Sequence, residues 1–123
     1  MSNPSVLIVE DDVWLGEQYT RVLIRAGYNV TLARHALEAI HAVDEINPDV
    51  IILDLLLTGS TAFALLHELQ SYEDTGSIPI IVCTSLASEL KIEELEPYGV
   101  KSVLDKAKME PGDLILALRR VLL

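Results

Sequence analysis

Four apolar residues run directly into three acids in the stretch VLIVEDD, residues 6–12. Comparable apolar runs recur in VIIL at residues 50–53 and in IIVC at residues 80–83. A strand with one solvated face alternates polar and apolar residues, whereas a strand covered on both faces reads as a continuous apolar run. The three runs therefore predict buried strands of a parallel sheet.

Two weaker apolar segments complete a set of five predicted strands, and amphipathic segments lie between them and after the last. Because strand and helix alternate five times with short connections, we expect an α/β protein with a doubly wound (βα)5 fold. The fourth helix, expected around Leu86 to Leu95, has the weakest periodicity, and the last helix opens at Pro111. The strands are expected at Val6–Val9, Asn29–Leu32, Val50–Leu53, Ile80–Cys83 and Ser102–Leu104.

The first two predicted helices have recognisable ends. Gly27 suits the end of the first, and Asn47-Pro48 suits the end of the second. Within the first helix, Trp14 and Tyr19 are expected to serve in packing rather than in ligand contacts.

Composition narrows the class of protein. The chain has 123 residues, a formal net charge of −10 and one cysteine, Cys83, whose apolar neighbours indicate a buried thiol. Nine scattered lysines and arginines argue against a direct nucleic-acid role. No apolar run approaches the roughly 20 residues of a spanning helix, and no secretory signal is visible at the start. We therefore expect a cytoplasmic, single-domain protein over residues 1–123 without membrane insertion or an output domain.

Polar residues follow the predicted strands at the edge where parallel sheets bind ligands. Glu10, Asp11 and Asp12 follow the first strand, and Asp54 follows the third. Packed carboxylates repel one another unless a hard cation such as Mg²⁺ lies among them, and a carboxylate can also accept a phosphoryl group. Thr84 after the fourth strand and Lys106 after the fifth add a hydroxyl and an ammonium that could bind phosphoryl oxygens.

These motifs resemble those of bacterial response-regulator receiver domains, in the family's order and over essentially the whole chain. VLIVEDD is similar to the opening strand and acidic loop, and DLLLTG at residues 54–59 to the phosphoacceptor loop. PIIVCTS at residues 79–85 is similar to the fourth strand, and residues 99–106 to the fifth strand with its lysine. The resemblance implies a flavodoxin-like sheet of five parallel strands in the order 2-1-3-4-5, with helices on both faces.

The resemblance also implies roles for individual residues. Asp54 would accept the phosphoryl group, and Asp54 and Asp11 would bind Mg²⁺ directly. Glu10 would hold the ion chiefly through water, and Leu56 would supply its backbone carbonyl. Thr84 would bind a phosphoryl oxygen, and Lys106 would pair with the phosphoryl group. Asp12 has two alternatives, a role in the site or a cap of the first helix.

The implied partners are a histidine kinase or phosphotransfer protein that donates the phosphoryl group and a downstream protein target. A weak homodimer is left open. The implied chemistry is limited to the domain's own phosphorylation and dephosphorylation, so the chain is not expected to be an enzyme acting on other substrates.

The sequence departs from the family pattern in two loops and at one switch position. Thr58 and Ala62 replace a usual proline and glycine, and Ala107 replaces the proline after the lysine, so we expect a trans Lys106–Ala107 bond. Val103 stands where many receivers have an aromatic residue that rotates on phosphorylation.

Three other functions compete with this interpretation. A pseudo-receiver that recruits a partner without phosphorylation is favoured by Val103, Thr58 and Ala107. A haloacid-dehalogenase-type phosphatase would need an acid where Leu56 stands. A flavodoxin would need hydroxyl and glycine donors in the first loop, which is acidic here.

Overall fold

A computed structural model describes residues 3–55 and 62–122 of the chain. Five parallel strands form one sheet in the order β2-β1-β3-β4-β5, as the resemblance implied. Each observed strand contains its predicted one or matches it, and the differences are one or two residues at the ends. The strands are β1 Ser5–Val9, β2 Asn29–Ala33, β3 Val50–Leu53, β4 Ile80–Thr84 and β5 Val100–Asp105.

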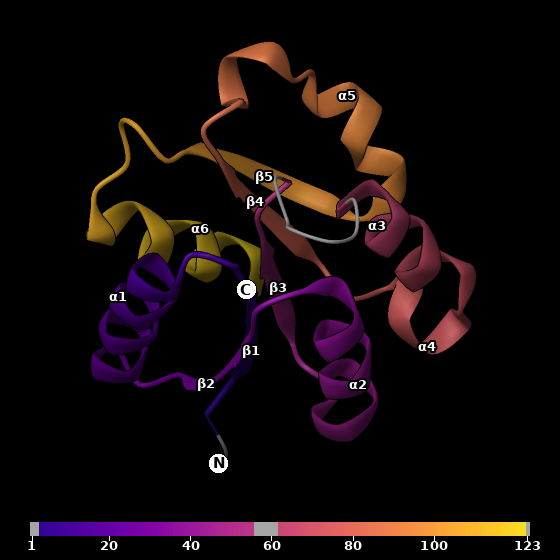
Figure 1. Ribbon diagram of the computed structural model, residues 1–123, viewed down its shortest axis with the longest axis horizontal. Helices are drawn as coiled ribbons and strands as arrows, with labels where there is room; N and C mark the ends of the chain where they lie inside the picture. The colour runs from indigo at the N-terminus through magenta and orange to yellow at the C-terminus, as the bar shows by residue number, and fades with distance from the viewer. Residues whose placement is uncertain (1–2, 56–61, 123) are drawn as a thin grey trace.

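Helices cover both faces of the sheet, so the fold is the predicted doubly wound one. Figure 1 shows α1 and α6 together on one side of the sheet and α2 and α3 on the other. The helices are α1 Val13–Arg25, α2 Ala36–Ile46, α3 Ala62–Ser71, α4 Glu73–Gly76, α5 Ile92–Leu95 and α6 Pro111–Leu122, with 3-10 turns η1 Ala87–Glu89 and η2 Glu96–Tyr98.

The central strands contribute to two apolar cores because successive side chains point to opposite faces. In β1, Leu7 and Val9 belong to the core under α2 and α3. Val6 and Ile8 belong to the core under α1 and α6. All four are at most 1% exposed. The continuous apolar runs of the sequence thus correspond to strands buried on both sides.

Local chemistry fixes the ends of the first two helices. The Asp12 carboxylate accepts a hydrogen bond from the backbone N–H of Leu15 at 3.0 Å, which caps α1. Gly27 follows this helix at φ +97°, and Asn47 ends α2 at φ 45°, both in the left-handed region. His35, which the sequence did not single out as a cap, accepts from the N–H of Glu38 at 3.3 Å and starts α2.

The connection between β4 and β5 differs from the prediction of one helix over Leu86–Leu95. It consists of η1, α5 and η2 in succession. Leu90 and Lys91 are extended, with ψ of 146° and 121°, and they separate η1 from α5. The weak apolar periodicity of this segment supplies no continuous buried stripe, so tertiary packing does not hold a single helix together.

A further element, α4, was not predicted. This four-residue helix follows α3 after Tyr72 and is tied back to it, because the buried Thr75 hydroxyl donates to the Leu69 carbonyl at 2.5 Å. Among the residues described, no helix combines the length and hydropathy needed to cross a bilayer.

Candidate functional site

Three carboxylates meet at the ends of β1 and β3. One ligand atom from each of Glu10, Asp11 and Asp54 lies within 4.8 Å of the others. Glu10 is 2% exposed and Asp54 4% exposed, while Asp11 is half-buried. The sheet fixes the backbone here, since the N–H of Glu10 donates to Ala33 and that of Asp54 donates to the carbonyl of Val9. Neighbouring parallel strands therefore bring together acids that are far apart in sequence.

Lys106 reaches this cluster from the end of β5. Its ammonium lies 2.9 Å from Oδ2 of Asp54 and 2.5 Å from Oε1 of Glu10. Its backbone N–H donates to the carbonyl of Thr84 at 3.1 Å, which links the end of β5 to the end of β4. The predicted acids and the predicted lysine thus form one connected group.

Burial and ion pairing act against each other in this group. Burial raises the pKa of the Glu10 carboxyl above its ordinary value, although the hydrogen bond from Lys106 opposes the rise. Burial also tends to lower the pKa of Lys106, but its hydrogen bonds to Glu10 and Asp54 outweigh that effect and raise it. The two carboxylates therefore favour the charged form of this ammonium.

The donor set fits a hard divalent cation. When all are ionised, the three carboxylates and the one ammonium carry a formal charge of −3 + 1 = −2. Carboxylate oxygens are the ligands that Mg²⁺ prefers, and a double positive charge would balance the group. Asp12 is outside this cluster of ligand atoms and caps α1, which agrees with its structural alternative.

Thr84 lies at the same edge, at the end of β4. Its side chain is fully buried, and its Oγ1 accepts a hydrogen bond from the N–H of Leu86 at 3.2 Å. β4 pairs directly with β3, the strand that precedes Asp54. The strand order therefore places the end of β4 next to the end of β3, which Asp54 follows.

The loop after Lys106 is organised by Asp105, for which the sequence predicted no role. The Asp105 side chain accepts from the N–H of Ala107 at 2.9 Å, and its carbonyl accepts from Lys108 and Met109. The Lys106–Ala107 bond is trans, as predicted. Aspartate commonly forms such turns, so Asp105 just before the lysine was the available signal.

The sequence also singled out Leu56, Thr58 and Val103. Leu56, the expected carbonyl ligand, and Thr58 lie outside the described residues. Val103 is half-buried and packs against the core under α2 and α3. Its small side chain fills part of the core margin and has no ring to rotate.

Two aromatic residues of α1 behave differently from each other. Tyr19 is buried beside Cys83, which is fully buried, so the prediction of a buried thiol is confirmed. Burial raises the pKa of this thiol to about 12. Trp14 was expected to pack within the helix, but its side chain is 66% exposed. It lines a surface groove of 250 Å³ together with Lys106 and Met109. The stripe of buried residues on α1 does not include position 14.

Comparisons with known proteins agree with the fold. The phosphate regulon transcriptional regulatory protein PhoB of Pseudomonas aeruginosa is 32% identical over 123 residues, which make up 99% of this chain and 53% of PhoB. The chain spans about half or less of the length of the curated relatives it matches. Because such relatives are transcriptional and DNA-binding regulators, the expected lack of direct nucleic-acid contact stays a prediction.

Two solved structures illustrate the similarity. The chemotaxis response regulator CheY4 of Vibrio cholerae superposes with a TM-score of 0.88 at 28% identity, covering 98% of this chain and 99% of CheY4. The second structure is the receiver domain of a sensor histidine kinase from Pseudomonas aeruginosa. It superposes with a TM-score of 0.87 at 24% identity and covers 98% of each chain. That domain has a magnesium ion coordinated in its active-site cleft.

A family model matches nearly the entire length of the chain, from the first buried strand into the last helix. Because this match covers residues 6–119, the chain belongs to the response regulator receiver domain family of two-component signalling.

Proposed function

We propose that this chain is a phosphorylation switch that accepts a phosphoryl group on Asp54. The observation that carries the proposal is the environment of this buried carboxylate. It lies 2.9 Å from the Lys106 ammonium and within 4.8 Å of carboxylate oxygens of Glu10 and Asp11. A carboxylate so placed has both a cationic group for the incoming phosphoryl oxygens and an acidic pair suited to a metal ion.

Asp11 and Asp54 would hold Mg²⁺ directly, Glu10 would hold it chiefly through water, and Leu56 would add its backbone carbonyl. The formal charge of −2 on the group supports a divalent ion. A bound magnesium ion would neutralise negative charge on the transferred phosphoryl group. The coordinated magnesium of the histidine-kinase receiver domain supports this choice of ion by analogy of fold.

In the phosphoryl transfer, an oxygen of the Asp54 carboxylate attacks phosphorus and forms a new P–O bond. The bond from phosphorus to the donor's imidazole nitrogen breaks, and its electron pair stays on the nitrogen. Lys106 would exchange a bond to a carboxylate for one to a phosphoryl oxygen. Thr84 would donate its hydroxyl hydrogen to another phosphoryl oxygen and give up its bond from Leu86.

The donor would be a histidine kinase or a phosphotransfer protein, and the output would be a contact with a downstream protein. Phosphorylation would change the pairing of Lys106 and Thr84, which belong to the ends of β5 and β4. The signal would therefore pass through these two strand ends and the segment between them. Val103 offers no ring for it, so backbone movement would carry the change.

The alternative is a pseudo-receiver that binds a partner without phosphorylation. The specific observation in its favour is Val103, which is half-buried against the core instead of being an aromatic switch residue. Ala107 after the lysine also favours it. The intact group of Glu10, Asp11, Asp54 and Lys106 favours the phosphorylated switch, because buried acids are costly to retain without use.

The deciding experiment is intact-mass spectrometry after incubation with acetyl phosphate, with and without Mg²⁺. We expect one magnesium-dependent phosphoryl adduct that is lost in Asp54→Asn. Asp12→Asn is the matched control, because it makes the same change at an acid that caps α1 instead of joining the cluster. An adduct that persists in Asp54→Asn would rule out this acceptor, and no adduct even with a purified kinase would favour the pseudo-receiver.

A further inference from the structure

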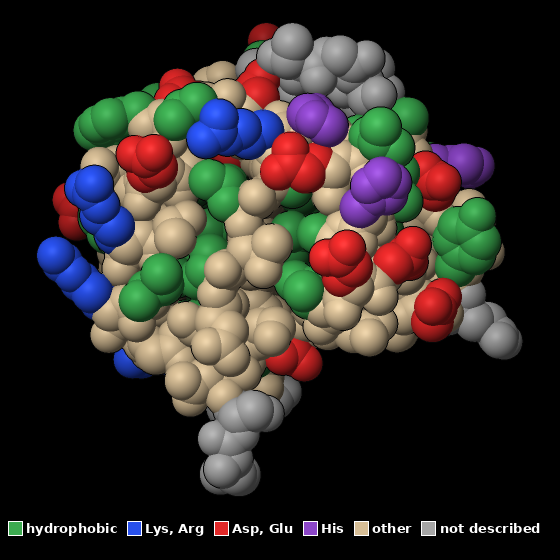
Figure 2. All heavy atoms as spheres, turned by 60° about the horizontal axis from the view of Figure 1, so that its bottom comes forward, with side chains coloured by type: hydrophobic (Ala, Val, Ile, Leu, Met, Phe, Trp, Pro, Cys, Tyr) green, Lys and Arg blue, Asp and Glu red, His purple; other side chains and the backbone are tan. Residues whose placement is uncertain are grey.

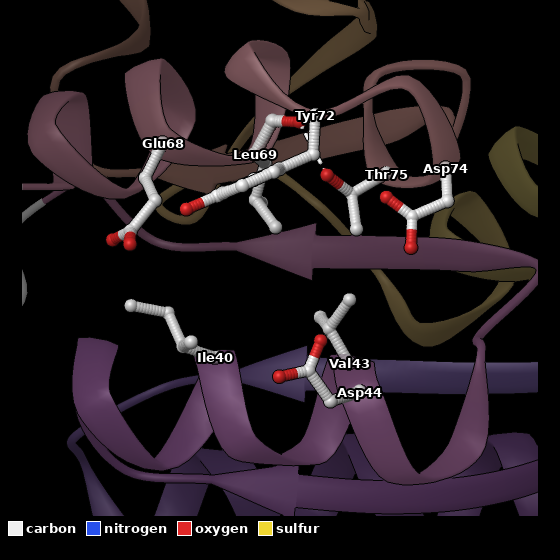
Figure 3. A pocket seen from close by; sticks show the side chains of 8 residues that line it. All are labelled: Ile40, Val43, Asp44, Glu68, Leu69, Tyr72, Asp74 and Thr75. Atoms are coloured by element: carbon white, nitrogen blue, oxygen red, sulfur yellow. Dashed lines mark hydrogen bonds between the residues drawn. The ribbon is translucent and has the colours of Figure 1, made fainter.

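A second hollow in the surface lies away from the acidic cluster, between α2 and the α3–α4 pair. It has a volume of 270 Å³, and none of the proposed site residues lines it. Its apolar floor consists of Ile40 and Val43 from α2 and Leu69 from α3. Figure 3 shows these side chains facing the gap between the two walls. The floor is suited to one aliphatic side chain from outside.

Three acids surround this apolar floor. Figure 3 shows Asp44 on the α2 wall, with Glu68 and Asp74 toward opposite ends of the facing wall. No lysine or arginine is among the lining residues, and within the described part of the chain no ion pair neutralises these three acids. At neutral pH the rim therefore has a formal charge of −3 that no neighbouring cation offsets.

The wider surface has the same sign of charge near the groove. Figure 2 shows acidic side chains in both halves of the view, with histidines among them on the right, the half that includes α2, and the lysines and arginines in view toward the left and the upper middle. A net charge of −10 adds a long-range attraction for cations. A second copy of this chain, equally acidic, would be repelled.

The outer wall is held in place before any partner arrives. The Thr75 hydroxyl donates to the Leu69 carbonyl, and the N–H of Gly76 donates to the carbonyl of Tyr72 at 2.8 Å. A Cβ on Gly76 would lie 3.3 Å from the Gln70 carbonyl oxygen, so the close approach favours glycine. The groove is thus preformed, which lowers the entropic cost of binding.

Tyr72 gives the rim an aromatic surface. Its side chain is 58% exposed and lies between Glu68 and Asp74 in Figure 3. An exposed ring between carboxylates attracts a lysine or arginine side chain by both cation–π and charge interactions. An apolar floor with an acidic, aromatic rim is complementary to a basic peptide segment that carries one aliphatic residue.

We infer that the groove between α2 and α3–α4 is a docking site for a basic peptide segment of a partner protein. An aliphatic side chain of the segment enters the floor formed by Ile40, Val43 and Leu69. Lysine or arginine residues on either side of it pair with Asp44, Glu68 and Asp74 along the rim. This contact is separate from the residues proposed for phosphorylation.

The test is fluorescence anisotropy with a labelled synthetic peptide that has a leucine between lysines, titrated with the full chain. We expect binding that weakens with added salt and weakens when glycine replaces the leucine. The double variant Asp44→Asn, Glu68→Gln should weaken binding about tenfold, from the summed loss of exposed charge pairs. Ile40→Gln should weaken it by removing part of the apolar floor.

The matched control is Glu93→Gln, Glu94→Gln on α5, which removes the same charge at exposed acids that do not line the groove. This control should retain wild-type affinity. Equal weakening in both double variants would show unspecific attraction to an acidic protein and overturn the proposal. Undetectable binding by wild type, or full competition by spermidine, a small polyamine without an aliphatic anchor residue, would also overturn it. Circular dichroism of each variant checks that the fold is retained.

Discussion

The ends of β1 and β3, which carry the acidic cluster, and the segment between β4 and β5 are built differently. β1 and β3 lie at the centre of the sheet, and their residues Val6–Val9 and Val50–Leu53 are almost fully buried. The segment from η1 to η2 consists of short turns with extended residues between η1 and α5. The carboxylate of Asp54, the proposed acceptor, therefore follows a fully buried strand, whereas the region proposed to relay the signal contains less regular secondary structure.

The largest expected difference between the two regions is in how much a substitution by alanine lowers the free energy of unfolding. Ile8 in β1 is fully buried, so Ile8→Ala should lower it by about 4 kcal/mol through lost burial and a cavity. Leu90 between η1 and α5 is only half-buried, so Leu90→Ala should cost about 1 kcal/mol. Urea unfolding followed by circular dichroism measures both values. Similar losses would mean that the two regions are packed equally well.

Lys106 follows β5 and pairs with two buried acids of the cluster, so its removal should have the next largest effect. Lys106→Met would leave the buried Glu10 and Asp54 carboxylates without their shared cation and should lower the free energy of unfolding by about 3 kcal/mol. The exposed Lys108 offers a control of the same substitution, which should change stability little. If both variants unfold at the same urea concentration, the ion pairs contribute nothing net.

Unfolding in the presence and absence of Mg²⁺ tests whether the cluster of Glu10, Asp11 and Asp54 is a metal site. At a concentration 100-fold above its Kd, the ion should raise the free energy of unfolding by about 2.7 kcal/mol relative to chelated samples. Asp11→Asn should lose most of this gain, because it removes one carboxylate of the cluster. Asp12→Asn should keep it. An unchanged gain in Asp11→Asn would place the ion elsewhere on this acidic protein.

The smallest expected effect concerns the helix that follows β1. Asp12→Ala removes the carboxylate that accepts from Leu15 N–H and should lower the free energy of unfolding by about 1 kcal/mol. Asp12→Asn keeps a capping oxygen and should be nearly neutral, which thermal unfolding can resolve. A loss in Asp12→Asn equal to that in Asp12→Ala would indicate that the charge, rather than the cap, matters.

The contrast between the buried central strands and the segment between β4 and β5 also explains which elements could be predicted from the sequence. β1, β3 and β4 were predictable because they are continuous apolar runs, and α2 because Asn47-Pro48 bounds its apolar stripe. The convergence of Glu10, Asp11, Asp54 and Lys106 followed from parallel strands ending at one edge.

What could not be predicted depends on local balances or on tertiary contacts. The split of the expected fourth helix occurs at the extended backbone of Leu90 and Lys91, within a segment whose apolar periodicity is weak. α4 is a single turn of helix held by the hydrogen bond from the Thr75 hydroxyl to the Leu69 carbonyl, and no periodic pattern marks it. For the same reason, the groove between α2 and α3–α4 could not be predicted from the sequence. Lys106 bridging two carboxylates rather than one is set by side-chain geometry.

The hydrogen bond from the Lys106 backbone N–H to the Thr84 carbonyl has a consequence for spectroscopy. The two residues proposed to bind the phosphoryl group share this one amide proton between their backbones. Any change in the spacing of the two strand ends alters the length of that bond. We therefore expect the chemical shift of the Lys106 amide to be a sensitive reporter of the phosphorylated state, in a protein that lacks the usual aromatic reporter at position 103.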